Sequence, residues 1–165
     1  MEQQYVVDTL RLNYQGLFSM EELLGVIDRW LAEKGYEKYD KKNYETVFED
    51  SRQLEVEMEP WRNITEEVKF VLKINLLITG LKDTVILKDK HREKLNEGKM
   101  LFTFDAIMET DLRYRWEGKG WLQFVRTLFD QFIYKGQQDR FEVLVAQEVE
   151  ELYYALKSHL NLYKY

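Results

Sequence analysis

The chain has 165 residues, with 24 basic and 30 acidic side chains and a formal net charge of -6. This length suits one domain spanning 1–165, and an apolar content of 45% with 15% aromatics favours a folded core over disorder. The chain contains no cysteine, which excludes a disulfide framework and thiol chemistry. The acidic balance also makes broad nucleic-acid binding a poor expectation, because attraction to phosphates needs a basic excess.

Neither a targeting segment nor a membrane span is predicted. Residues 1–9 lack the basic start and apolar stretch of a signal peptide. The most apolar stretch, 68–78, is interrupted by Lys69 and Lys73, and a bilayer span needs about 20 mostly apolar residues. We therefore expect a cytoplasmic protein.

The N-terminal region predicts a strand followed by a helix. Residues 5–14 form an apolar run whose second half alternates, as in a half-buried strand, and Gly16 is expected to end it. Ser19 and Glu22 have the spacing of a capping box, and apolar residues then recur at steps of three and four. Gly35 is expected to end this helix, since glycine tolerates left-handed geometry.

The next segments predict antiparallel strands at 43–50, 52–59 and 68–79, with a turn at 60–63. From Leu54 to Glu59 the even positions are apolar and the odd ones are glutamates, and in 68–79 the even positions are again apolar. In an antiparallel pair, the numbers of directly opposite residues have a constant sum. If that sum is even for these two strands, their apolar residues lie on one face and the glutamates lie opposite Lys69 and Lys73. The acidic row is therefore interpreted as the solvated face of a sheet.

The following region predicts a turn at 80–82, a short strand at 84–87 and a charged loop at 88–94. Alternation returns at 102–108, which predicts a further strand.

The C-terminal region predicts two helices. The first covers 121–134 and is expected to end at Gly136, and the second runs from about 139 to 162. At 1.5 Å per residue the second helix would span about 35 Å, enough to cross a sheet. We therefore expect an α+β domain in which a curved antiparallel sheet of five or six strands packs against a long C-terminal helix, with two further helices.

This order of elements resembles the helix-grip architecture of START-like proteins. The resemblance implies a curved sheet wrapped around the terminal helix, often with an apolar ligand cavity between them. The predicted fold departs from that family because a helix precedes the terminal one and because 17–35 forms one long helix. Residues 116–118 and 121–124 also look like segments of small archaeal proteins of unassigned function.

Few residues suggest catalysis or metal binding. The two histidines, His91 and His159, are far apart in sequence, and without cysteine the usual zinc sites are nearly excluded. Asp105 and Glu109 share a strand face but would lie about 13 Å apart, too far for joint acid–base work on one bond. No phosphate-binding loop is present. We expect no cofactor and favour a role other than catalysis.

The sequence favours two functions, while a third, enzymatic one would require Asp105, Glu109 and a nearby tyrosine or arginine to converge in a pocket. The first is non-enzymatic binding of an apolar small molecule or lipid between the sheet and the terminal helix. Its candidate lining residues are Phe70, Phe102, Phe104, Asp105, Trp121 and Phe124. The second is a protein-interaction or self-assembly module that uses the C-terminal helix to contact a protein partner or another copy. Its candidate residues are Tyr153, Tyr154, Tyr163 and Tyr165.

Overall fold

The computed structural model describes residues 2–110 and 120–163, with the side chains of the last helix described from Asp139 onward. It is an α+β fold, as predicted. The elements in chain order are β1 (Glu2–Phe18), α1 (Met20–Lys34), β2 (Asp40–Val47), β3 (Arg52–Met58), β4 (Trp61–Asn63), β5 (Val68–Lys88), β6 (His91–Thr110) and α2 (Gly120–Asn161).

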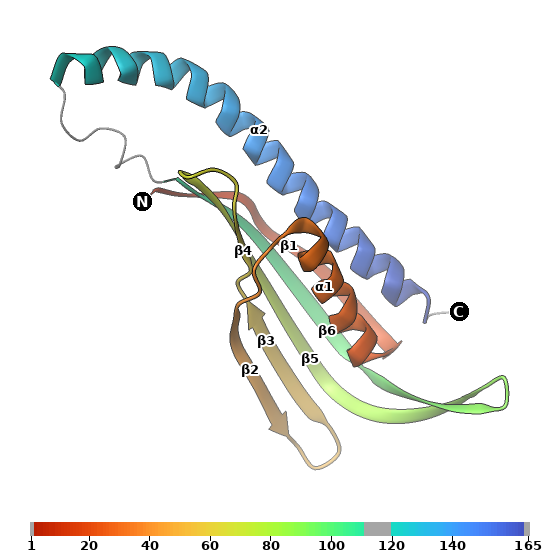
Figure 1. The fold of residues 1–165 in the computed structure, drawn as a ribbon. Helices are drawn as coiled ribbons and strands as arrows, with labels where there is room; N and C mark the ends of the chain where they lie inside the picture. The colour runs from red at the N-terminus through yellow and green to blue at the C-terminus, as the bar shows by residue number, and fades with distance from the viewer. Residues whose placement is uncertain (1, 111–119, 164–165) are drawn as a thin grey trace.

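The strands form one antiparallel six-stranded sheet in the order β1-β6-β5-β3-β2, with β4 beside β5. Both helices lie on the same face of this sheet, and the hairpin between β5 and β6 extends past the other strands (Figure 1). The two ends of the order, β1 and β2, are therefore the edges of the sheet. The antiparallel sheet of the prediction is confirmed.

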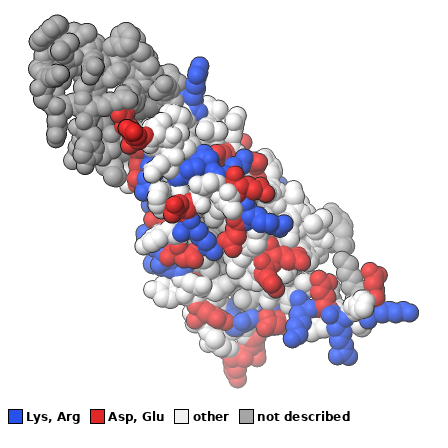
Figure 2. All heavy atoms as spheres, in the orientation of Figure 1, with Lys and Arg blue, Asp and Glu red and all other residues white. Residues whose placement is uncertain are grey.

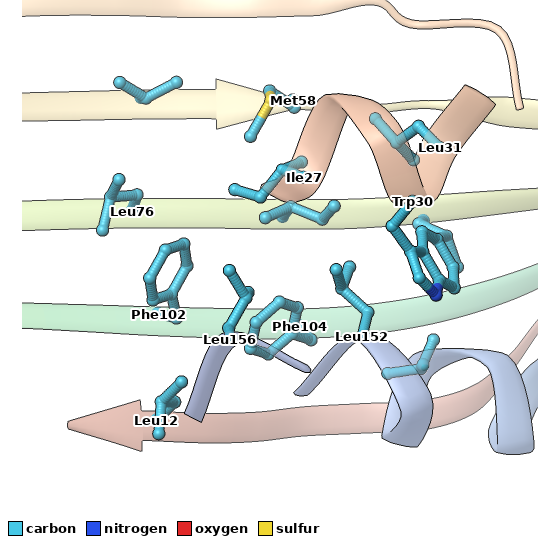
Figure 3. Packing of buried hydrophobic residues seen from close by; sticks show 14 of the residues in the cluster. Leu12, Ile27, Trp30, Leu31, Met58, Leu76, Phe102, Phe104, Leu152 and Leu156 are labelled. Atoms are coloured by element: carbon cyan, nitrogen blue, oxygen red, sulfur yellow. The ribbon is translucent and has the colours of Figure 1, made fainter. Parts of the chain in front are cut away.

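The core lies between the helices and the even-numbered residues of the central strands. Side chains of a strand alternate between the two faces, so one face of β5 and β6 is apolar throughout its middle. Figure 3 shows Phe102 and Phe104 pointing from β6 toward Leu152 and Leu156 of α2. All four side chains are at most 1% exposed. Burial of this face holds α2 on the sheet.

The predicted even-sum pairing of β3 with β5 is confirmed. Val56 lies opposite Leu76, and the flanking pairs keep the same parity. The predicted partners of the two lysines are wrong, because Glu55 lies opposite Leu77 and Glu57 opposite Asn75. Lys69 and Lys73 lie opposite Glu109 and Asp105 of β6, on the other side of β5. The paired part of β3 is displaced along β5, so the lysines lie beyond its end.

Glu57 of β3 and Glu59, which follows it, instead form ion pairs with lysines of the edge strand. Lys42 Nζ lies 3.7 Å from Glu57, and Lys41 Nζ lies 3.0 Å from Glu59. These pairs lie on the face of the sheet that the helices leave open.

Three predicted interruptions of the sheet are wrong. The segment 80–82 is a bulge within β5, where Gly80 adopts a φ of 62° and the register shifts. The expected charged loop at 88–94 belongs mostly to the hairpin strands, because Asp89 and Lys90 form a tight turn with φ values of 51° and 69°. β1 likewise continues through Gly16.

The expected turn at 60–63 contains a short strand. Its residues Trp61–Asn63 form β4 and pair with β5, so this prediction is also wrong. The pairing fixes the position of Arg62, which lies opposite Phe70 on the helix-covered face.

The two helices predicted near the C-terminus are one. α2 has 42 residues and passes through Gly136 without ending. A glycine inside a helix costs about 1 kcal/mol relative to alanine, which is not enough to end α2 at this position. The fold therefore has two helices in its described residues instead of the three predicted.

Both predicted ends of α1 are confirmed. The Ser19 hydroxyl accepts a hydrogen bond from the Glu22 amide at 3.3 Å, and Gly35 adopts a left-handed φ of 79°. Asn96 of β6 adds a cap that sequence reasoning missed, since its Oδ1 accepts from the Met20 amide at 2.9 Å. The start of α1 is thereby fixed to the sheet.

Two glycine-to-alanine substitutions in α1 should have opposite effects on stability. Gly35→Ala should lower the free energy of unfolding by about 1 kcal/mol, because alanine is strained at positive φ. Gly25→Ala should raise it by about 0.5–1 kcal/mol, because Gly25 is inside the helix and has open space beside it. Urea denaturation of both variants measures the difference, and effects of the same sign would contradict this account of the cap.

Charged side chains of both signs are interspersed over the face shown in Figure 2. The acidic side chains that stand alone at its lower end coincide with the β2–β3 hairpin of Figure 1. No helix within the described ranges is long and apolar enough to cross a membrane.

Candidate functional site

Three of the predicted ligand-binding residues lie together in the core. Phe70, Phe102 and Phe104 are at most 1% exposed and share the helix-covered face of the sheet. Phe70 contacts Phe141 edge to face at a ring separation of 6.3 Å, and Phe104 contacts Tyr153 in the same way at 6.3 Å. These rings thus pack against side chains of α2. The side chains of the other two aromatics of the set, at positions 121 and 124, lie outside the described residues.

Asp105, the remaining candidate, lies on the opposite face of the sheet from these phenylalanines. It is cross-strand to Lys73, and its Oδ1 accepts a hydrogen bond from the Thr9 amide at 2.6 Å. Thr9 has a φ of 57° in a stretch where β1 shifts its register against β6. Asp105 therefore stabilises an irregular part of β1 and is not brought together with the aromatic candidates.

A buried polar cluster joins three elements on the helix-covered face. Arg62 of β4 donates to Glu148 of α2 at 2.6 Å and to the carbonyl of Lys34 at the end of α1 at 2.5 Å. The Tyr36 hydroxyl donates to the other oxygen of Glu148 at 2.5 Å. Glu148 is 5% exposed and so has little contact with water. Arg62 and Tyr36 therefore stabilise its carboxylate in place of solvent.

Aromatic rings enclose this cluster. The Arg62 guanidinium lies 4.9 Å from the centre of the Tyr36 ring and 5.7 Å from that of Phe70. Trp30 stacks on Tyr36 with ring centres 5.6 Å apart. Burial, with the neighbouring Glu148 carboxylate, raises the pKa of Tyr36 well above its ordinary value. The phenol therefore remains protonated as a hydrogen-bond donor, which favours a structural role over acid–base chemistry.

Sequence reasoning missed this cluster. Arg62 fell within the segment predicted as a turn, and Glu148 was passed over among the apolar residues of the last helix. One signal was available, because Glu148 lies at helical spacing between Val145 and Leu152, both of which are fully buried. A carboxylate in such a stripe requires a buried partner.

The edge strand β2 is exposed along its whole length. All eight of its residues are exposed, among them Tyr44 at 60% and Val47 at 72%. Two further exposed aromatics flank the strand, Tyr39 at 55% and Phe48 at 54%. No strand of the described chain pairs with the outer side of β2, and Figure 1 shows it at the margin of the sheet.

The hydrogen bonds of the β2–β3 hairpin show which backbone groups of β2 face outward. The Phe48 amide donates to the Ser51 carbonyl at 2.7 Å. Bonded and non-bonded pairs alternate along antiparallel strands, so the even-numbered residues of β2 bond to β3. The N–H and C=O groups of Asn43, Glu45 and Val47 consequently point away from the sheet.

The tyrosines proposed for a helix-based interface are differently placed. Tyr153 packs against Phe104, and the Tyr163 hydroxyl donates to Glu22 of α1. Tyr154 is 59% exposed, and position 165 lies outside the described residues. Two of the three described tyrosines therefore serve the fold, which leaves β2 as the more open surface.

Among the described residues, no group of three or more histidines and carboxylates is placed to hold a metal ion. No protein-family model and no curated protein sequence matches this chain.

Proposed function

We propose that this protein is a protein-interaction module that binds an extended segment of a partner along β2. The observation that supports the proposal is the outward row of backbone groups at Asn43, Glu45 and Val47 on a fully exposed edge strand. An unpaired strand edge of this kind is a template for another strand, whose main-chain hydrogen bonds supply affinity.

The protection of this edge is limited to its first residues. The register of β2 shifts between Asp40 and Lys42, and bulges and lysines are common means of blocking an edge. From Asn43 to the hairpin turn the strand is regular and contains no lysine or proline. The exposed Tyr44 and Val47 side chains offer contacts on the two faces of an added strand.

The experiment begins by selecting peptides that bind the parent protein from a displayed library of short random peptides. The affinity of the selected peptides is then measured for two variants of Glu45. Glu45→Pro removes an amide that faces outward and should leave the β2–β3 bonds intact, because proline is tolerated on edge strands. Glu45→Ala keeps the amide and is the matched control. Selected peptides should bind Glu45→Pro about tenfold more weakly and Glu45→Ala nearly as well as the parent. Peptides that bind both variants equally would contradict the proposal.

Binding of an apolar small molecule or lipid between the sheet and α2 stays a prediction. The packing of Phe70 and Phe104 against Phe141 and Tyr153 gives these rings protein partners and leaves the edge strand as the better-supported site. A lipid-extract binding assay followed by mass spectrometry tests this function independently of β2.

A further inference from the structure

We infer that the segment that binds β2 is β2 of a second copy of this chain, arranged antiparallel about a two-fold axis. This inference rests on the proposed function, because it requires the same free edge. Its basis is the sequence of the strand, which in one symmetric register sets no like charges opposite each other and brings the two Tyr44 rings together.

Hydrogen bonding restricts the possible registers. In an antiparallel pair, a residue whose backbone faces the partner must lie opposite another such residue. The outward residues of β2 are odd-numbered, so a symmetric pairing can be centred on Asn43, Tyr44 or Glu45 without leaving the middle of the strand. A slip by one residue in either copy would set bonded groups against unbonded ones.

Charge and strand geometry favour the middle one of these pairings. Centring on Glu45 would set two carboxylates directly opposite each other, which is destabilising. Centring on Asn43 would place Glu45 opposite Lys41, which lies in the irregular stretch of the strand and already pairs with Glu59 at 3.0 Å. Centring on Tyr44 avoids both problems.

The Tyr44-centred pairing also gives favourable contacts. Asn43 of each copy lies opposite Glu45 of the other, whose Oε1 already accepts from Arg52 at 3.1 Å. The side-chain amide of Asn43 is therefore placed to donate to the second oxygen of that carboxylate. The two Tyr44 rings face each other at the non-hydrogen-bonded position, where side chains approach most closely and aromatic pairs are favourable. Lys42 lies opposite Thr46, so no like charges are paired.

Sedimentation velocity of the full chain over a range of concentrations tests the dimer. The parent should show a concentration-dependent monomer–dimer equilibrium, Glu45→Pro should weaken dimerisation about tenfold or more, and Glu45→Ala should weaken it less. Tyr44→Lys provides a second variant at an exposed residue, where the fold is not at risk. Circular dichroism checks that each variant is folded.

A charge-swap experiment tests the register. Tyr44→Lys and Tyr44→Glu should each be monomeric alone, because like charges would meet at the axis, and their mixture should form a heterodimer. No other residue of β2 lies opposite itself in this pairing, so the mixed rescue is specific to a Tyr44 centre. Failure of the mixture to associate while the parent dimerises would overturn this register.

Cross-linking gives an independent readout, because the chain has no natural cysteine. In the Tyr44→Cys variant the Cα atoms of the two cysteines would lie about 4.5 Å apart, as in a non-hydrogen-bonded pair, which a disulfide can bridge. Thr46→Cys, on the same face, would leave its two Cα atoms about 13 Å apart and is the matched control. Equal oxidation of both variants to dimers would contradict the arrangement.

The outcomes distinguish this inference from the proposed function. A parent that is monomeric at every concentration overturns the dimer, and selected peptides sensitive to Glu45→Pro would still support β2 as an interaction edge. A dimer that Glu45→Pro and Tyr44→Lys leave unchanged overturns the inference as well, since the contact would then lie elsewhere.

Discussion

Replacing Arg62 with methionine is expected to lower the free energy of unfolding by about 3–5 kcal/mol at neutral pH. The substitution removes the guanidinium that is ion-paired at 2.6 Å with Glu148, a carboxylate that is 5% exposed. It also leaves the Lys34 carbonyl at the end of α1 without the arginine donor. The loss reflects an uncompensated buried charge more than the value of the ion pair itself.

Urea denaturation followed by circular dichroism measures this effect. The double variant Arg62→Met with Glu148→Leu should recover much of the loss, because apolar residues of similar size often replace a buried ion pair without cost. The exposed pair of Lys38 with Asp28, 3.0 Å apart, is the control, and Lys38→Ala should cost no more than about 1 kcal/mol. A loss below about 1 kcal/mol for Arg62→Met would contradict the structural role of this cluster.

Phe104→Ala is expected to cost about 3–5 kcal/mol of stability, the range for removing a large aromatic from a packed core. Phe104 is 1% exposed, stacks on Phe102 with ring centres 5.6 Å apart and contacts Tyr153 of α2. Its loss would open a cavity at the junction between the sheet and α2, where neighbouring rings have little freedom to fill the space.

Thermal or urea unfolding of Phe104→Ala should be compared with that of Leu87→Ala. Leu87 is also in the sheet but is 77% exposed, so its truncation should change stability by no more than about 0.5 kcal/mol. Similar losses in the two variants would mean that the core is not packed as described.

The alternation of apolar residues in the central strands was enough to predict the sheet and to predict which of its residues face the helices. The even-numbered residues of 54–58 and 68–78 face the helices, because a slip by one residue would expose both rows at once. The ends of α1 were also predictable, since Ser19 and Gly35 act through bonds and dihedral angles of the neighbouring backbone.

Interruptions of the elements were harder to predict because the same residues fit more than one structure. Gly80 permits a turn or a bulge, and pairing with β6 selects the bulge. Gly136 could end a helix or lie within one, and α2 continues through it. Such choices depend on contacts between segments distant in sequence.

The candidate site was predicted only in part for the same reason. Because even- and odd-numbered residues of a strand point to opposite faces, the sequence placed Phe70, Phe102 and Phe104 on one face and would have placed Asp105 on the other. The Arg62–Glu148 pair joins residues 86 positions apart, and no local pattern indicates such a partner. The free edge at β2 follows from the order of the strands, which alternation does not determine.

The two edges of the sheet differ in a way that limits how far assembly can proceed. The first half of β1 has two register shifts, and the Thr9 amide there is held by Asp105, whereas β2 is regular from Asn43 onward. Two copies joined through their β2 strands would form one continuous sheet with β1 at each of its outer ends. Growth should therefore stop at a closed pair and not continue into a filament.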